Sequence, residues 1–87
     1  MSHVRVSANV ATHWEGETAY VGLLPAGPLV SFSGGGALIW SLLLEAGAET
    51  IVERTAAAAE LPAEAVRGDV LAFVTQCADL GLLEPAD

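Results

Sequence analysis

The chain has 87 residues, of which 53% are hydrophobic, and its formal net charge is −8, with three arginines and no lysine. Because nucleic acids and anionic membranes are bound through clustered Lys and Arg side chains, this composition argues against both kinds of partner. The lone cysteine, Cys77, excludes an intrachain disulfide and a structural zinc site built on several thiolates. Since no signal-peptide pattern and no apolar run of about 18–20 residues are present, the sequence predicts a cytoplasmic protein without a membrane span.

A β-hairpin is predicted in the first part of the chain. Hydrophobic and polar residues alternate from Val4 to Trp14, which is typical of a half-buried strand, and Ser7 marks a break in it. Gly16 supplies a turn, and the run Thr18–Leu24 predicts the returning strand. The residues of the first strand expected to face the core are Val4, Val6, Ala8, Val10, Thr12 and Trp14.

A short third strand and an apolar helix follow. The run Leu29–Phe32 comes after two prolines and is short enough for an edge strand. Ser33 is expected to be the cap, or the last residue before the cap, of a helix whose composition is helical from Ala37 to Ala46. The three glycines between Ser33 and Ala37 are expected to form a hinge. Hydrophobic residues cover most of this helix, so we expect it, with Trp40, to be buried on most sides.

Two further helices are predicted. One runs from Thr50, as its cap, to Ala59 and has a thin apolar face. The other begins near Pro62 and ends at Gly81, and its apolar residues fall within an arc of about 120° around the helix axis. Asp69 lies at the border of this arc. The arc consists of Ala63, Val66, Val70, Phe73, Val74, Cys77 and Leu80.

The order of these elements predicts an α+β fold. Strands over residues of about 3–33 precede helices over residues of about 35–83, which favours three helices on one face of a three-stranded antiparallel sheet. The last two helices are joined by a tight connection, as in a helix-turn-helix pair, so the arrangement is winged-helix-like. The length predicts one domain over residues 1–87.

No catalytic or metal-binding constellation is evident in the sequence. His3 and His13 share a strand face, but no cluster of Cys or carboxylate residues accompanies them, so we expect no metal site. Cys77 lies on the apolar arc, where a thiol behaves as a small hydrophobic side chain. The three glycines lack the lysine that would meet a phosphate. We therefore expect neither enzymatic activity nor a cofactor.

The predicted edge strand allows a binding function. Leu29–Phe32 carries no charge, and an uncharged edge invites pairing with another strand. An extended peptide can add to such an edge through backbone hydrogen bonds, while side-chain contacts provide specificity. The alternative is an edge too short to attract any partner, and these residues alone do not decide between the two.

The order of motifs from Gly36 to Glu84 resembles the PqqD family. In that family a G-x-x-IW-x-LL segment leads to a helix with D-V-x-x-F and then to a closing GLL. The predicted hairpin and the short third strand also agree with the N-terminal sheet of the family. The matching residues are Gly36, Ile39, Trp40, Leu42, Leu43, Asp69, Val70, Phe73, Gly81, Leu82 and Leu83.

This resemblance implies a RiPP recognition element, a domain that binds the leader of a ribosomally synthesised and post-translationally modified peptide (RiPP) precursor. In such domains the leader adds as a strand to the third strand of the sheet and rests against the third helix. The implied receiving edge consists of Leu29, Val30, Ser31, Phe32 and Ser33. The implied opposing wall is the exposed margin of the third helix, with Val66, Asp69, Val70 and Phe73. Asp69 is implied to meet a polar or basic group of the leader.

The resemblance also implies a separate maturation enzyme. Discrete domains of this size resemble the leader-binding proteins of lasso-peptide pathways, which serve a leader peptidase, and PqqD itself, which serves a radical SAM enzyme. The alanine-rich second helix and the triple glycine depart from the family pattern, so the pathway stays open. Two other classes also stay open: a structural or dimerising subunit of a larger enzyme and, against the acidic charge of the third helix, a winged-helix transcription regulator. A homodimer is compatible with leader binding.

Overall fold

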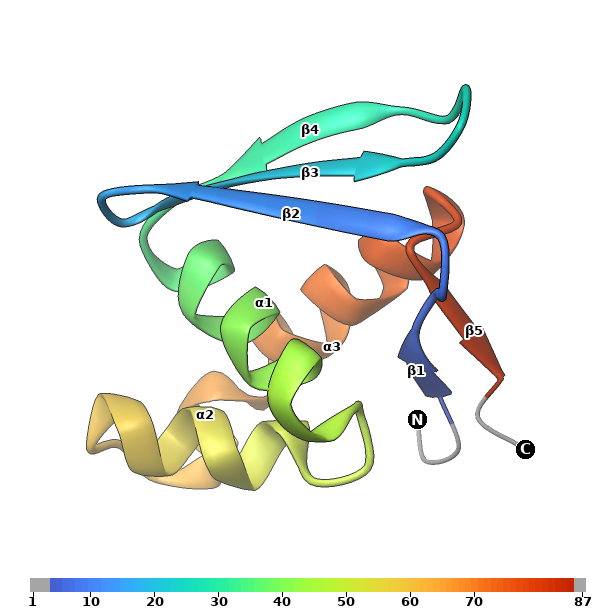
Figure 1. The fold of residues 1–87 in the computed structure, drawn as a ribbon. Helices are drawn as coiled ribbons and strands as arrows, with labels where there is room; N and C mark the ends of the chain where they lie inside the picture. The colour runs from blue at the N-terminus through green and yellow to red at the C-terminus, as the bar shows by residue number, and fades with distance from the viewer. Residues whose placement is uncertain (1–3, 86–87) are drawn as a thin grey trace.

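The computed structural model describes residues 4–85, which form a three-stranded antiparallel sheet followed by three helices (Figure 1). The large sheet has the order β2-β3-β4, and the helices lie on one of its faces. The predicted α+β fold class is thereby confirmed. The elements in chain order are β1 (Val4–Val6), β2 (Val10–Glu15), β3 (Thr18–Leu23), β4 (Leu29–Phe32), α1 (Gly35–Ala46), α2 (Ile51–Ala59), α3 (Ala63–Asp79) and β5 (Leu83–Pro85).

The predicted hairpin is formed by β2 and β3, and its break is where the sequence placed it. Gly16 opens the two-residue loop with φ +60°, the conformation that a type II′ turn requires at that position. The chain bends after Ser7, so that β1 is not part of the large sheet. Two residues expected to be buried are exposed. Ala8 lies in the bend. Trp14 is on the helix-facing side of β2, as Thr12 is, but it is 41% exposed, and the end of the hairpin extends beyond α1 (Figure 1).

A second, two-stranded sheet joins the two ends of the described chain, and the sequence did not indicate it. β1 pairs antiparallel with β5. Arg5 and Glu84, opposite each other in this pair, form an ion pair of 3.0 Å. The Ser7 hydroxyl donates to the Gly81 carbonyl at 2.9 Å, just after α3. The Ala48 amide, just after α1, donates to the Val4 carbonyl at 3.0 Å. These contacts tie both ends of the chain to the helices.

The predicted apolar helix, α1, is the centre of the core. The Trp40 side chain is fully buried and lies 5.6 Å from the ring of Phe32 between centroids. Its Nε1 donates a hydrogen bond to Thr12 Oγ1 at 3.1 Å, which links α1 to β2. Burial of the helix and of Trp40 is confirmed, although Leu44 on the far side is exposed.

Ser33 is the residue directly before the cap of α1, which is the second of the two positions expected for it. The helix begins at Gly35, and the cap is Gly34, which makes no side-chain hydrogen bond. Gly34 has φ +58°, a left-handed conformation that favours glycine, because the chain reverses there between β4 and α1. Gly35 and Gly36 are already helical, so the expected three-residue hinge reduces to one residue.

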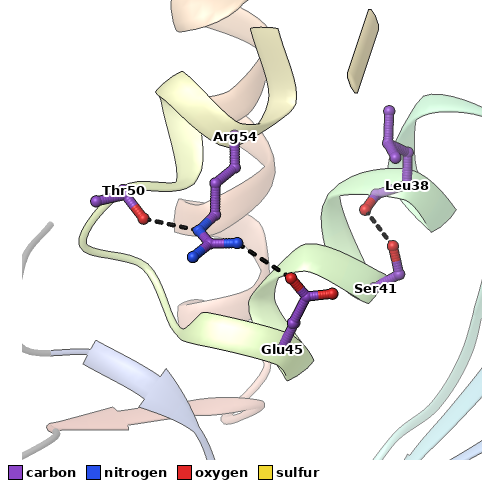
Figure 2. A network of polar contacts seen from close by, with 5 residues as sticks. All are labelled: Leu38, Ser41, Glu45, Thr50 and Arg54. Atoms are coloured by element: carbon purple, nitrogen blue, oxygen red, sulfur yellow. Dashed lines mark hydrogen bonds and ion pairs between the residues drawn. The ribbon is translucent and has the colours of Figure 1, made fainter. Parts of the chain in front are cut away.

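The other two helices begin where they were predicted, after Thr50 and after Pro62. Arg54 fastens α2 to α1 (Figure 2): its Nε donates to Thr50 Oγ1 at 3.0 Å, and its Nη1 donates to Glu45 Oε1 at 3.0 Å. Between α2 and α3 the chain turns at Glu60, with φ +57°. Within residues 4–85, no helix has the length and apolar character needed to cross a membrane.

Candidate functional site

β4 forms one edge of the large sheet, and no described strand lies beyond it. The Leu23 amide donates to the Pro28 carbonyl at 3.1 Å, so these two residues form a hydrogen-bonded pair just before β4 begins. In an antiparallel ladder bonded and non-bonded pairs alternate, so Val30 and Phe32 bond to β3. The residues whose N–H and C=O groups point away from the sheet are therefore Leu29 and Ser31.

The side chains of β4 divide between the two faces of the sheet. Leu29 is 79% exposed, and Ser31 is also exposed on the outer face. Phe32 points to the helices and is buried, with its ring centroid 4.8 Å from that of Phe73 in an edge-on arrangement. Val30 is partly buried against the core. Of the five predicted edge residues, Leu29, Ser31 and the exposed Ser33 are accessible by their side chains, whereas Phe32 lies beneath the edge.

Helix α3 runs beneath this edge, and two contacts define its direction. Phe73 meets Phe32 at the end of β4. At the other end of the helix, a methyl group on Gly81 would lie 3.1 Å from Leu23 Cδ2, next to the residue that pairs with Pro28. The segment from Phe73 to Gly81 therefore runs back along β4 from its end to its beginning.

Two of the predicted wall residues are buried, contrary to the expectation that they lie on an exposed margin. Val70 is 1% exposed and Val66 is 9% exposed, because this side of α3 packs into the core against α1 and α2. Asp69 is exposed, and Phe73 is half-buried. Asp69 and Phe73 thus lie on the accessible flank of α3, where their role in binding stays a prediction.

Two further residues lie on this flank and were not among the binding residues predicted from the sequence. Gln76 and Leu80 follow Phe73 by three and seven residues, which places them on the same side of the helix, along the stretch that runs under β4. Gln76 is exposed, and Leu80 is partly buried. Asp69 precedes Phe73 by one turn and so lies beyond the end of β4. The i, i+3, i+7 spacing from Phe73 was the available signal for both residues.

The accessible flank of α3 carries a carboxylate, Asp69, without a described counter-ion. Arg5 pairs with Glu84, and Arg54 pairs with Glu45 at 3.0 Å (Figure 2). Arg67 is on α3, but about 120° around the helix from Phe73, away from the edge of β4. Asp69 forms no ion pair or hydrogen bond with residues 4–85 through its side chain. A cationic group arriving at this flank would meet an unneutralised carboxylate.

Other kinds of chemistry find little support in the described residues. Cys77 is fully buried, and desolvation raises the pKa of its thiol to about 12, so the reactive thiolate is disfavoured. His13 is exposed and lies 3.7 Å from Glu15, while His3 is outside the described residues. Residues 4–85 contain no group of three or more His, Cys, Asp or Glu side chains that could hold a metal, and they enclose no pocket.

The family model described as "Coenzyme PQQ synthesis protein D (PqqD)" matches residues 17–83. The chain belongs to the PqqD family. The match includes β3, β4 and all three helices, which confirms the resemblance inferred from the sequence motifs.

This PqqD-family chain is also similar to TbiB1 in a solved structure of TbiB1 in complex with the TbiA(beta) leader peptide. The TM-score is 0.80 at 27% sequence identity, and the similarity covers 92% of this chain and 94% of TbiB1. The two proteins therefore share one fold over nearly their whole length. No curated protein sequence matches the chain.

Proposed function

We propose that this PqqD-family protein binds the leader of a RiPP precursor as an added strand on the open edge of β4. The observation that carries the proposal is the edge itself, where the N–H and C=O groups of Leu29 and Ser31 point away from the sheet above α3. The edge has no charged side chain to repel a strand. Further support comes from the similarity to TbiB1, which was solved with a leader peptide.

The bounds of the edge limit the recognised segment. The Gly27 amide is already bonded to the Leu23 carbonyl at 2.7 Å, and the chain turns away at Gly34, so the shared ladder extends over about five leader residues at most. Leader residues opposite Leu29 and Ser31 form the backbone hydrogen bonds. The leader residue between them points its side chain to the helices, because successive side chains alternate across a strand. That side chain reaches the flank of α3 with Phe73, Gln76 and Leu80, which favours an apolar anchor.

Asp69 supplies the polar part of the proposed site. The carboxylate lies one helical turn before Phe73 and has no described partner, so a lysine, an arginine or a polar group at one end of the leader segment completes it. The net charge of −8 adds a general preference for leaders that are not strongly acidic. Both effects weaken as the salt concentration rises.

The protein is proposed to bind and present the leader without acting on it, and a separate maturation enzyme performs the chemistry. A leader peptidase is the preferred partner, following the resemblance to discrete leader-binding proteins of lasso-peptide pathways, and a radical SAM enzyme is the alternative. The two partners differ in the product they leave. Adding the protein to a precursor and a peptidase should accelerate cleavage after the leader, whereas a radical SAM partner would modify the core and leave the leader attached.

The test is a fluorescence-anisotropy titration with the labelled leader half of a precursor, and the unlabelled core half serves as competitor control. Ser31→Pro removes an outward N–H and places a ring on the edge, but the ladder between β3 and β4 does not use this N–H. We expect Ser31→Pro to weaken leader binding about 30-fold or more, and the matched Ser31→Thr, which keeps the N–H, to stay within about twofold.

Circular dichroism and thermal unfolding establish that Ser31→Pro is folded before the affinities are compared. Wild-type binding of the leader half alone, lost in Ser31→Pro and kept in Ser31→Thr, supports strand addition at β4. If folded Ser31→Pro binds as tightly as the wild type, β4 is not the receiving edge. If neither half of the precursor binds, the leader-binding proposal is wrong, and a structural subunit is the better account.

A further inference from the structure

The opposite edge of the sheet, β2, is also open. No described strand lies beyond β2, which is the strand at the other side of the sheet from β4 in Figure 1. The Leu24 amide donates to the Asn9 carbonyl at 2.9 Å, which makes these two residues a bonded pair just before β2 begins. Alternation along the ladder then directs the odd-numbered residues of β2 to β3. The residues whose backbone groups point outward are Val10, Thr12 and Trp14.

One of the outward backbone groups of β2 already has a hydrogen-bond partner within the chain. The Val10 amide donates to the Ser7 carbonyl at 3.2 Å, within the bend that precedes the strand. The Val10 carbonyl accepts no backbone hydrogen bond from the loops and turns of residues 4–85. The same holds for the N–H and C=O groups of Thr12 and Trp14. The edge thus offers two donors and three acceptors. It contains no proline, and its only carboxylate, Glu15, lies at the end of the strand, so the segment from Val10 to Trp14 lacks the acidic side chains and prolines that protect many edge strands.

We propose that β2 is the interface of a homodimer, in which a second copy of the chain pairs antiparallel with β2 about a two-fold axis at Thr12. The pairing would join two three-stranded sheets into one sheet of six strands, in the order β4-β3-β2-β2-β3-β4. Such an interface is self-complementary, as two-fold symmetry requires, because each copy offers the same edge to the other.

The hydrogen-bonding pattern of β2 fits this axis. With Thr12 opposite Thr12 of the second copy, the two residues exchange a pair of N–H to C=O bonds. The Trp14 N–H of each copy then donates to the Val10 carbonyl of the other copy. Each unused donor finds an acceptor, for four bonds in all, and the Val10 amide, already bonded to Ser7, needs no partner.

The side chains fit the same axis. Trp14 is 41% exposed in this structure, and it would lie directly opposite Val10 of the second copy, on the face toward the helices. An aromatic residue opposite a β-branched residue is among the favourable cross-strand pairs. Glu15 would lie opposite Asn9 of the second copy, so no acidic side chain opposes another across the ladder. A second copy supplies both partners of the Trp14–Val10 pair from its own β2, which is why we choose it as the occupant of this edge.

The dimer leaves β4 free at both ends of the six-stranded sheet, so this interface and the proposed leader-binding edge do not compete. It does not depend on leader binding. Because each copy carries a net charge of −8, the copies repel each other at low salt, and association is expected to strengthen as salt is added.

The first test is sedimentation of the intact protein over a range of concentrations up to about 0.5 mM in about 0.5 M NaCl. We expect a mass that rises with concentration from 8.9 kDa to twice that value. Thr12→Pro removes the central N–H and should raise the dissociation constant of the dimer about 30-fold or more, since both central bonds are lost. The matched Thr12→Val loses the same hydroxyl but keeps the N–H, and it should stay within about threefold of the wild type.

A cross-link tests the register even if Thr12→Pro fails to fold. Ala11 would lie opposite His13 of the second copy in a non-bonded pair, with Cα atoms about 4.5 Å apart, close enough for a disulfide. Ala11→Cys and His13→Cys proteins should form a disulfide-linked dimer when mixed and oxidised, but neither should do so alone. Cys77 is buried and does not interfere.

Each outcome decides the proposal. A wild-type protein that remains a monomer over the whole range overturns it. A folded Thr12→Pro variant that dimerises like the wild type places the interface elsewhere. Cross-linking of Ala11→Cys alone, as efficient as that of the mixture, overturns the axis at Thr12.

Discussion

The two edges of the large sheet differ in what surrounds them. β4 has four residues, ends at the turn on Gly34 and lies above the accessible flank of α3. β2 has six residues, and its own sequence provides the complement for a second copy. Both edges present outward N–H and C=O groups, so free backbone groups alone do not select a partner. The length of the edge and the side chains beside it are the grounds on which we propose a peptide for β4 and a second copy for β2.

The largest expected effects come from exchanging the two proline variants between the two assays. Ser31→Pro should weaken leader binding about 30-fold and change dimerisation less than twofold, and Thr12→Pro should do the reverse. The measurements are leader anisotropy and sedimentation for both variants. If a folded variant impairs leader binding and dimerisation equally, the two edges are coupled, and the proposal that they act independently is wrong.

Phe73 sharpens the comparison because its ring packs against Phe32 of β4. The ring also lies 3.2 Å from where a methyl group on Gly36 would be. We expect Phe73→Ala to weaken leader binding about tenfold, to lower the free energy of unfolding by about 2 kcal/mol and to leave dimerisation unchanged. Denaturant unfolding and the two binding assays measure these quantities. Phe73→Leu is the control and should lose less than half as much in each.

Gly34 tests how β4 is joined to the helices. Alanine at this position must adopt φ +58°, so Gly34→Ala should lower the free energy of unfolding by about 1 kcal/mol. Gly35→Ala is the matched control: the position is helical, with no atom near the added methyl, so it should raise stability by about 0.5 kcal/mol. Denaturant unfolding checks both. We also expect the Gly34 turn to let β4 adjust when a leader docks, and unchanged leader affinity in both variants would contradict this.

Asp69 is expected to have a smaller effect on the β4 side. Asp69→Asn should weaken binding of a leader with a basic residue about threefold and flatten the salt dependence of its affinity. Asp79→Asn removes the same charge from an exposed position that is about 120° around α3 from Phe73, and it should change the affinity much less. Anisotropy titrations at low and high salt make the comparison. Equal effects of the two variants would mean that Asp69 acts only through the net charge of the protein and does not contact the leader.

Cys77 provides the smallest effect and should not distinguish the edges. Because burial raises the pKa of the folded thiol from 9.0 to about 12, its contribution to stability is complete below pH 9 and is lost as the pH rises toward 12. At pH 9 the loss is about 0.4 kcal/mol relative to neutral pH. Unfolding of the wild type and Cys77→Ala between pH 7 and about pH 10 measures the difference in slope. Equal slopes would mean that the thiol titrates as in the unfolded chain.

Several features of the fold and the site follow from local patterns in the sequence. The alternation around Val10 and the glycine at position 16 predict the hairpin, because a strand face and a turn conformation depend on near neighbours. Leu29–Phe32 matches β4 residue for residue, since prolines and glycines bound it. The order of motifs around Trp40 and Phe73 was sufficient to recognise the PqqD family.

Tertiary structure decided the rest. The pairing of β1 with β5 joins strands of three residues at opposite ends of the chain, and so short a run carries no periodic signal. The apolar arc of α3 indicated which residues avoid water, but packing against α1 and α2 determined that Val70 is covered while Phe73 stays half-exposed. The phase of each ladder, which turns Ser31 and Thr12 outward, depends on long-range hydrogen bonds. Side-chain periodicity is a local property, whereas pairing and burial depend on residues distant in the sequence.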